Sequence, residues 1–148
     1  DGSGQRRTIM RQGFLNGDAS TDILTQLEAL AGTANHQHGL ADTGGDAASG
    51  TGANNGAHAS GVTGQVGSTF YAIQGNVLTG SPVVSMAEQA FVNTVGDLPE
   101  KVMTAMEAAR DSTVSQLALV PQVPGFGSLS LAVTQQASAC VQAREMPL

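Results

Sequence analysis

The most suggestive polar residues of the chain stand at the end of a predicted strand. Phe70-Tyr-Ala-Ile-Gln74 is rich in aromatic and apolar residues, and Gly75 and Asn76 follow it as a predicted turn or bulge. A side-chain amide at a strand end can orient a ligand carbonyl or stabilise an oxyanion, which makes Gln74 and Asn76 candidate substrate-binding residues. The structural alternative is that Asn76 only adopts a turn geometry and that Gln74 only ties down a loop.

The histidines are the other candidate ligating side chains. His36 and His38 alternate along the chain, as two ligands on one side of a strand would, and His58 follows in a Gly-rich segment. No third ligand stands at a spacing typical of zinc motifs. We therefore predict no metal site and no cofactor, and histidines that are solvated or hydrogen-bonded.

Sequence motifs identify no catalytic residue. The segment Gly50–Gly56 lacks the Lys-Ser/Thr pair of a phosphate-binding loop, and the chain has no Gly-x-Ser-x-Gly nucleophile elbow. The single cysteine, Cys140, excludes an internal disulfide and a cysteine-based zinc site. Because it lies in a tail without clear periodicity, we expect a passive thiol there.

Composition sets wider limits on function. The 148 residues carry a net charge of −6 with only six Lys and Arg, so the basic stripe that nucleic-acid binding needs is missing. With 41% hydrophobic and 12% charged residues, the chain favours collapse into a single domain over residues 1–148. No apolar run reaches the roughly 18 residues of a membrane span. We expect a soluble protein, cytoplasmic or secreted, with any targeting segment absent from this chain.

A helix pair is predicted in the first part of the chain. Apolar spacing over Arg6–Leu15 predicts one helix, which ends at Asn16-Gly17 because both residues tolerate the left-handed conformation. A second helix begins with Ser20 or Thr21 as its N-cap and ends at Gly32.

A second helix pair is predicted after the polar cluster. The first helix begins at Ser81-Pro82 and ends at Gly96. The second begins at Asp97-Leu-Pro-Glu100, a sequence typical of a capping box. The buried face of the first is predicted to contain Val83, Val84, Ala87, Ala90, Phe91 and Val95.

The remaining segments predict strands. Gly39–Gly80 is either a low-complexity linker or a set of Gly-rich strands that need close backbone approach. Ser115–Val120 and Ser128–Thr134 are typical of a strand hairpin, with prolines and glycines between them. The order of elements predicts an α/β (α+β) fold in which helices are layered over an antiparallel sheet.

One motif carries a resemblance to a known family. Ala72-Ile-Gln-Gly-Asn-Val-Leu-Thr-Gly80 resembles, almost position for position, the Ala-x-Gln-Gly-Asn-x-Leu-x-Gly motif of a prokaryotic-type family of unknown function. That family has a fold like the N-terminal-nucleophile (Ntn) hydrolases. Thr51-Gly52 and Ala57-His58 resemble its Thr-Gly and Gly-His positions, and both predicted helix pairs are similar to its own.

The resemblance implies an Ntn-hydrolase-like layered sandwich and, by fold analogy, hydrolysis of amide bonds. It adds His58 to Gln74 and Asn76 as a candidate substrate-binding residue. An Ntn hydrolase attacks with a Thr, Ser or Cys at its N-terminus, a role that Asp1 cannot fill. We therefore expect an incomplete domain that lacks the N-terminal strands of the family.

Two other classes of function remain open at this stage. A non-catalytic structural or self-assembling protein, an oligomer or filament subunit, would use a free sheet edge to pair with another copy. A binder of small molecules or glycans would have a pocket without a base near a nucleophile. We expect a homo-oligomer whose substrate, where one exists, is a small molecule or is peptide-like.

Overall fold

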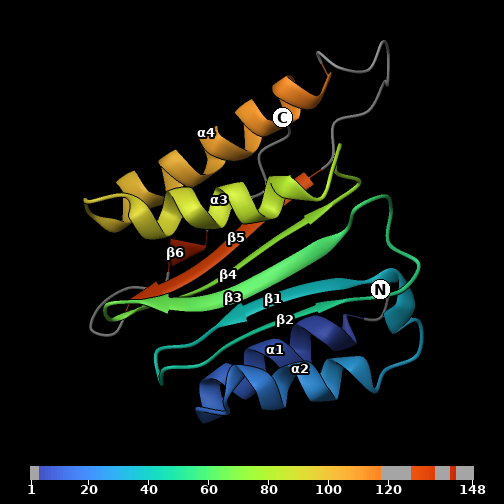
Figure 1. Ribbon diagram of the computed structural model, residues 1–148. Coiled ribbons are helices and arrows are strands. Elements are labelled where there is room, and N and C mark those ends of the chain that lie inside the picture. The colour runs from blue at the N-terminus through green and yellow to red at the C-terminus, as the bar shows by residue number, and fades with distance from the viewer. Residues whose placement is uncertain (1–3, 118–127, 136–140, 143–148) are drawn as a thin grey trace.

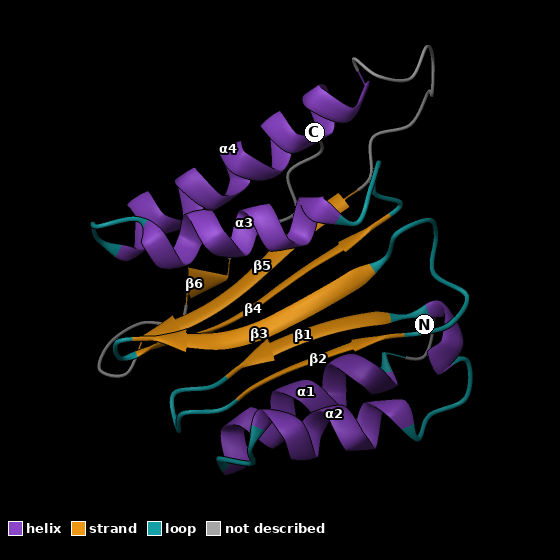
Figure 2. Cartoon of the chain, viewed as in Figure 1, coloured by secondary structure: helices purple, strands orange, loops and turns teal. Residues whose placement is uncertain are grey.

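The protein is built from four layers of secondary structure. The computed structural model describes residues 4–117, 128–135 and 141–142. One helix pair covers a two-stranded sheet, a four-stranded sheet lies against that sheet, and a second helix pair covers the outer face (Figures 1 and 2). The predicted α+β class, with helices over antiparallel sheets, is therefore confirmed, although the strands form two sheets.

The first helix pair closely follows the sequence prediction. Helix α1 (Gln5–Asn16) ends at Gly17, whose φ of 79° is the left-handed conformation that glycine adopts without strain. Helix α2 (Ser20–Glu28) has Ala19 as its N-cap, so the predicted N-cap at Ser20 or Thr21 is wrong: both residues are already helical, and their hydroxyls donate to Asp42 and Asp46. The helix also ends before the predicted Gly32. A short 3-10 turn, η1 (Thr33–Asn35), follows it.

The Gly-rich segment forms strands, so the linker alternative is wrong. Strands β1 (Gln37–Ala41) and β2 (Ala47–Thr51) make an antiparallel hairpin that is the two-stranded sheet. Glycine lets the second sheet approach closely, because a Cβ atom at Gly39 would lie 2.7 Å from Oε1 of Gln74. Packing between the two sheets therefore accounts for Gly39, and for Gly61 of β3, where a Cβ atom would collide with Oγ of Ser49 on β2.

The four-stranded sheet has the order β3 (Ser60–Val66), β4 (Thr69–Asn76), β5 (Ser128–Gln135) and β6 (Val141–Gln142), all antiparallel. The predicted strand at 115–120 is wrong over 115–117, which continue helix α4 (Leu98–Leu117). The rest of that prediction and Cys140 lie outside the described residues. Strand β5 pairs with β4 and β6, and Gly75 and Asn76 belong to β4 instead of a turn.

The main apolar core lies between the four-stranded sheet and the second helix pair. Alternate residues of β4 separate its two faces: Tyr71 and Ile73 pack toward helices α3 (Pro82–Asn93) and α4, whereas Gln74 faces the other sheet. Val95 is fully exposed, contrary to prediction, because α3 ends at Asn93. The other buried members of this core are Leu78, Val83, Val84, Ala87, Phe91, Ala105 and Ala109.

The capping box at the start of α4 is confirmed. The backbone N–H of Asp97 donates to Oε2 of Glu100 at 3.1 Å, and the N–H of Glu100 donates to Oδ1 of Asp97 at 3.0 Å. This exchange satisfies two N–H groups that a helix start leaves without partners. Among the described residues no helix combines the length and apolar character that a membrane crossing requires.

Candidate functional site

The predicted site residues lie at one end of the two-sheet sandwich. Strand pairing places the start of β1 beside the end of β2, and the start of β3 beside the end of β4. The loop of residues 52–59 joins β2 to β3 across this end, and residues 77–81 lead from β4 into α3 (Figure 1). We call this region the loop end of the sandwich.

Asn76 connects the end of β4 to the loop. Its Nδ2 donates to Oδ1 of Asn55 at 3.1 Å, and its Oδ1 accepts the backbone N–H of Gly56 at 2.9 Å. The backbone N–H of Leu78 donates to the carbonyl of Ala57 at 2.9 Å, which adds a second link. Left-handed backbone occurs at the next residue, Val77, and not at Asn76, so the turn interpretation of Asn76 is wrong.

Gln74 lies between the two sheets. Its side chain is 9% exposed and packs against Gly39 of β1. Within the described part of the chain its Oε1 has no hydrogen-bond partner, and the same holds for Oγ of Ser49 on β2. Gln74 therefore ties down no loop, and it places a buried acceptor next to the loop end.

Gln37 is a polar residue that the sequence analysis missed. Its Nε2 lies 3.1 Å from the carbonyl of Ser60 and 3.0 Å from the carbonyl of Gly75, so β1 is hydrogen-bonded to β3 and β4 across the sandwich. The same nitrogen is 3.1 Å from Oγ1 of Thr51. The sequence alone could not identify Gln37, because its contacts with Ser60 and Gly75 depend on how the two sheets pack against each other.

His58 lies on the outside of the loop. It is exposed, its φ is 54°, and its Nδ1 lies 3.5 Å from Oγ of Ser81. Ser81 is the N-cap residue of α3, yet its side chain makes no capping hydrogen bond. The structure thus brings Asn76 and His58 to the same loop, with Gln74 buried beside it and not beside His58.

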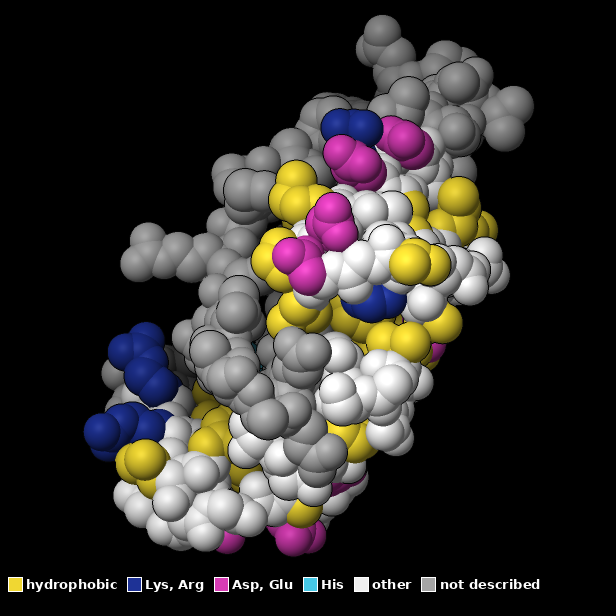
Figure 3. Space-filling model, turned by 90° about the vertical axis from the view of Figure 1, so that its left-hand side faces the viewer, with side chains coloured by type: hydrophobic (Ala, Val, Ile, Leu, Met, Phe, Trp, Pro, Cys, Tyr) yellow, Lys and Arg dark blue, Asp and Glu magenta, His cyan; other side chains and the backbone are white. Residues whose placement is uncertain are grey.

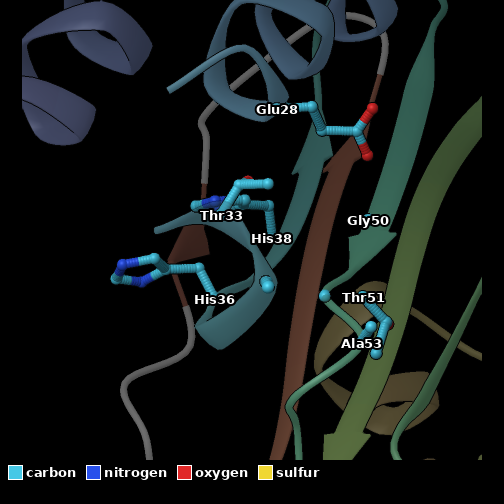
Figure 4. A pocket seen from close by; sticks show the side chains of 9 residues that line it. Glu28, Thr33, His36, His38, Gly50, Thr51 and Ala53 are labelled. Carbon is cyan, nitrogen blue, oxygen red and sulfur yellow. The ribbon is translucent and has the colours of Figure 1, made fainter. Parts of the chain in front are cut away.

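The other two histidines line a separate cavity, of about 340 Å³, on the outer side of the two-stranded sheet (Figure 4). The His36 and His38 rings stack with centroids 6.0 Å apart. In the described residues no three His, Cys, Asp or Glu side chains gather as a metal site would require. The residues around the cavity are Glu28, Thr33, Ala34, His36, His38, Gly50, Thr51, Gly52 and Ala53.

Arg6 sets the electrostatics beside this cavity. Its side chain, 5% exposed, donates to the carbonyls of Leu27 and Ala31 at 2.9 Å each, where α2 ends. Its Nη1 also lies 3.5 Å from Nε2 of His38. Burial, and then the Arg6 charge, lower the pKa of His38, so its imidazole is held neutral at pH 7. Arg6 is thus a helix cap, and His38 is a neutral hydrogen-bonding group.

Comparison with known proteins identifies a family without an assigned activity. Residues 5–113 match the model of a family of unknown function, DUF1028. The fold is similar to the crystal structure of protein SPO2555 from Silicibacter pomeroyi, which is described with the same family model, at a TM-score of 0.67 and 22% sequence identity. The alignment covers 90% of this chain and 54% of that one, so the chain spans about half the length of this relative. No curated protein matches the sequence significantly.

Proposed function

We propose that this chain, which belongs to the DUF1028 family of unknown function, is part of an Ntn-hydrolase-like protein that hydrolyses amide bonds. The observation that carries the proposal is the layer order of helices, sheet, sheet and helices, with polar side chains gathered at one end of the sandwich. Because a fold hosts many activities, the argument depends on the polar groups at that end.

Asn76 is proposed to bind the carbonyl of a peptide-like substrate. Its Nδ2 now donates to Asn55, so a substrate carbonyl that displaces Oδ1 of Asn55 would accept the same N–H group. The bond from Gly56 to its Oδ1 fixes which end of the amide is the donor. A donor that is held in place before the reaction stabilises the negative charge that develops on the substrate oxygen.

Gln74 and His58 take the other predicted binding roles. The buried Oε1 of Gln74 is an acceptor for a substrate N–H group that enters between the sheets. His58 is exposed at the loop, where an imidazole can exchange protons with the substrate and solvent. Asn76 and Gln74, on one face of β4, would recognise a planar amide by its carbonyl oxygen and its N–H group, and His58 would meet the substrate on the outside of the loop.

The test is amine release from a panel of N-acyl amino acids and short peptides by the full-length natural protein. Asn76→Ala should lower the rate by about 10²-fold, the usual effect of one missing oxyanion donor. Asn54→Ala is the matched control, because Asn54 lies in the same loop and its side chain donates to Asn35 at 3.0 Å. Equal rates for the two variants would remove Asn76 from the site, and no amine release from any substrate would contradict the function itself.

A specific observation also favours the second candidate, a self-assembling protein. Thr63 and Gln65 of β3 are exposed on the face that points toward the two-stranded sheet, so that sheet does not cover them. β3 is also an edge strand among the described residues. Figure 3 shows apolar and acidic side chains next to one another on the surface of the molecule. The large apolar side chains that are exposed on α3, on α4 and between them are Met86, Val92, Val95 and Met103.

An uncovered edge strand can pair with a second copy of the chain, because its backbone groups on the open side lack strand partners. Light scattering of the purified protein would then show an oligomer, and Thr63→Lys should dissociate it because a charge on the edge opposes pairing. A monomer at all concentrations would rule out assembly through this edge.

A further inference from the structure

We propose that Ser81 and His58 form a nucleophile–base pair that performs acyl transfer at the loop end of the sandwich. The inference rests on the proposed amide hydrolysis and names a nucleophile and a base for it among the residues of this chain. Oγ of Ser81 lies 3.5 Å from Nδ1 of His58, and both side chains are exposed to solvent and to a substrate. Such pairs are often long in the absence of substrate and shorten when it binds.

The Ser81 hydroxyl is not used as the cap that its position predicts. A serine at the N-cap of a helix normally accepts a backbone N–H of the first turn, but Ser81 makes no such bond. The next serine of the helix, Ser85, instead donates to the carbonyl of Pro82 at 3.0 Å. Ser81 therefore keeps its lone pairs and its proton for His58 and a substrate.

Backbone strain is concentrated in the two segments that bring the pair together. His58 and Val77 are the only residues other than glycine with positive φ among the described residues, each at 54°. A β-branched residue such as valine rarely adopts this conformation. Strained residues persist where neighbouring contacts hold them in place, and they occur often at active sites.

Hydrogen bonds between the segments maintain this strained arrangement. Asn76 accepts the N–H of Gly56, and Leu78 donates to the carbonyl of Ala57. These bonds hold both sequence neighbours of Val77 and the residue before His58. The loop that carries His58 is thereby held against the segment that leads to Ser81. Asn76 acts in this proposal as a positioning residue in addition to its proposed contact with substrate.

The reaction follows from the positions of the two groups. His58 Nδ1 takes the Ser81 hydroxyl proton as Oγ bonds to the substrate carbonyl carbon, which gives a tetrahedral oxyanion. The carbon–nitrogen bond then breaks, and the imidazolium returns the proton to the leaving amine. Water adds to the resulting ester, transfers a proton through His58, and releases the acid and free Ser81. The overall reaction consumes one amide and one water and yields one acid and one amine.

A fluorophosphonate probe with mass spectrometry tests the pair directly, since it phosphonylates an activated serine and releases fluoride. We expect labelling of Ser81 in the natural protein and its loss in Ser81→Ala. His58→Asn should slow the labelling by at least about 10²-fold, because it removes the base while asparagine also tolerates left-handed backbone. Ser85→Ala is the matched control and should be labelled at the natural rate.

The same variants separate this proposal from the proposed function. Amine release that falls in Ser81→Ala and His58→Asn supports the pair as the catalytic residues. Amine release that persists in Ser81→Ala but falls in Asn76→Ala overturns the pair and leaves the amide hydrolase in place. Labelling of Ser85 at the rate of Ser81, or equal labelling of Ser81 with and without His58, also overturns it, because the serine would then be merely accessible.

Discussion

The two helix layers of the protein are attached to their sheets by different forces. The outer layer of α3 and α4 buries an apolar core against β3 and β4 that includes Phe91, Tyr71 and Ile73. Between the layer of α1 and α2 and the β1–β2 hairpin, the buried apolar cluster is only Ile23, Leu27 and Leu40, and hydrogen bonds to the carboxylates of Asp42 and Asp46 join the two. Short Gly-rich strands offer little apolar area, so polar groups must supply part of the attachment.

The polar attachment is concentrated at the two ends of α2. At its start, Oδ2 of Asp42 accepts the backbone N–H and the hydroxyl of Ser20, both at 2.9 Å. Oδ2 of Asp46 accepts the same two groups of Thr21, at 2.9 and 2.8 Å. At its end, Arg6 of α1 donates to the carbonyls of Leu27 and, just beyond the helix, of Ala31, and these bonds hold α1 to α2. Caps that normally come from adjacent residues come here from a distant hairpin and from α1.

The largest loss of stability is expected from the apolar layer. Phe91→Ala should lower the free energy of unfolding by about 3–5 kcal/mol, because the ring is fully buried and lies 5.0 Å, centroid to centroid, from that of Tyr71. Urea denaturation followed by circular dichroism measures the change. Val92→Ala, on the next residue of α3 and partly exposed, should cost less than about 1 kcal/mol. Similar losses for the two variants would contradict the location of the core.

A smaller loss is expected from the polar layer. Asp42→Ala leaves the N–H of the buried Ser20 without its acceptor and leaves the hydroxyl with only the carbonyl of Asp46 at 3.4 Å, which should lower the free energy of unfolding by about 1–3 kcal/mol. Asp22→Ala is the control, because Asp22 is an exposed carboxylate in the first turn of the same helix. If Asp22→Ala were as destabilising as Asp42→Ala, the helix dipole and not the hairpin cap would account for the effect.

The same carboxylate makes the polar layer sensitive to acid. Partial burial alone would raise the pKa of Asp42, but hydrogen bonds from Ser20 and from the backbone of Asp46 and Gly44 lower it below the usual 3.8. Its contribution to stability is therefore complete above about pH 4 and is lost as the pH falls through the folded-state pKa. Urea midpoints measured from pH 6 downward should fall less steeply for Asp42→Ala than for the natural protein.

Local sequence signals predicted the apolar layer better than the polar one. The spacing of Val83, Ala87 and Phe91 and the capping box at Asp97 identified α3 and the start of α4, because these features are encoded within a few residues of one another. The Gly39–Gly56 region has no apolar alternation, and its strands contain glycines that are closely approached by distant elements: Gln74 of β4 lies against Gly39, and Leu24 and Glu28 of α2 lie against Gly50. Asp42 and Asp46, which cap the start of α2, lie 22 and 25 residues from the groups that they accept, so no local sequence pattern predicts them.

The candidate site was predictable in its residue types and not in its arrangement. The sequence predicts Gln74 and Asn76 as site residues because amides stand at a strand end, and strand alternation places both on one face of β4. His58 and Ser81 are 23 residues apart in the sequence, and their contact depends on left-handed backbone at His58 and at Val77. Neither a histidine nor a valine predicts that conformation, so the pair could emerge only from the folded loop.

The smallest expected effect concerns a polar bond inside the apolar layer. The hydroxyl of Tyr71 donates to Oε1 of Glu88 at 2.9 Å, and burial together with this carboxylate raises the pKa of Tyr71 to about 12. Because the chain has one tyrosine, absorbance at alkaline pH reports this group alone. Glu88→Gln should move the midpoint toward the ordinary value near 10 and change the free energy of unfolding by only about 1 kcal/mol, because packing and not this bond holds α3 to β4. A loss as large as that expected for Phe91→Ala would show that both layers depend on carboxylates, and the contrast between them would disappear.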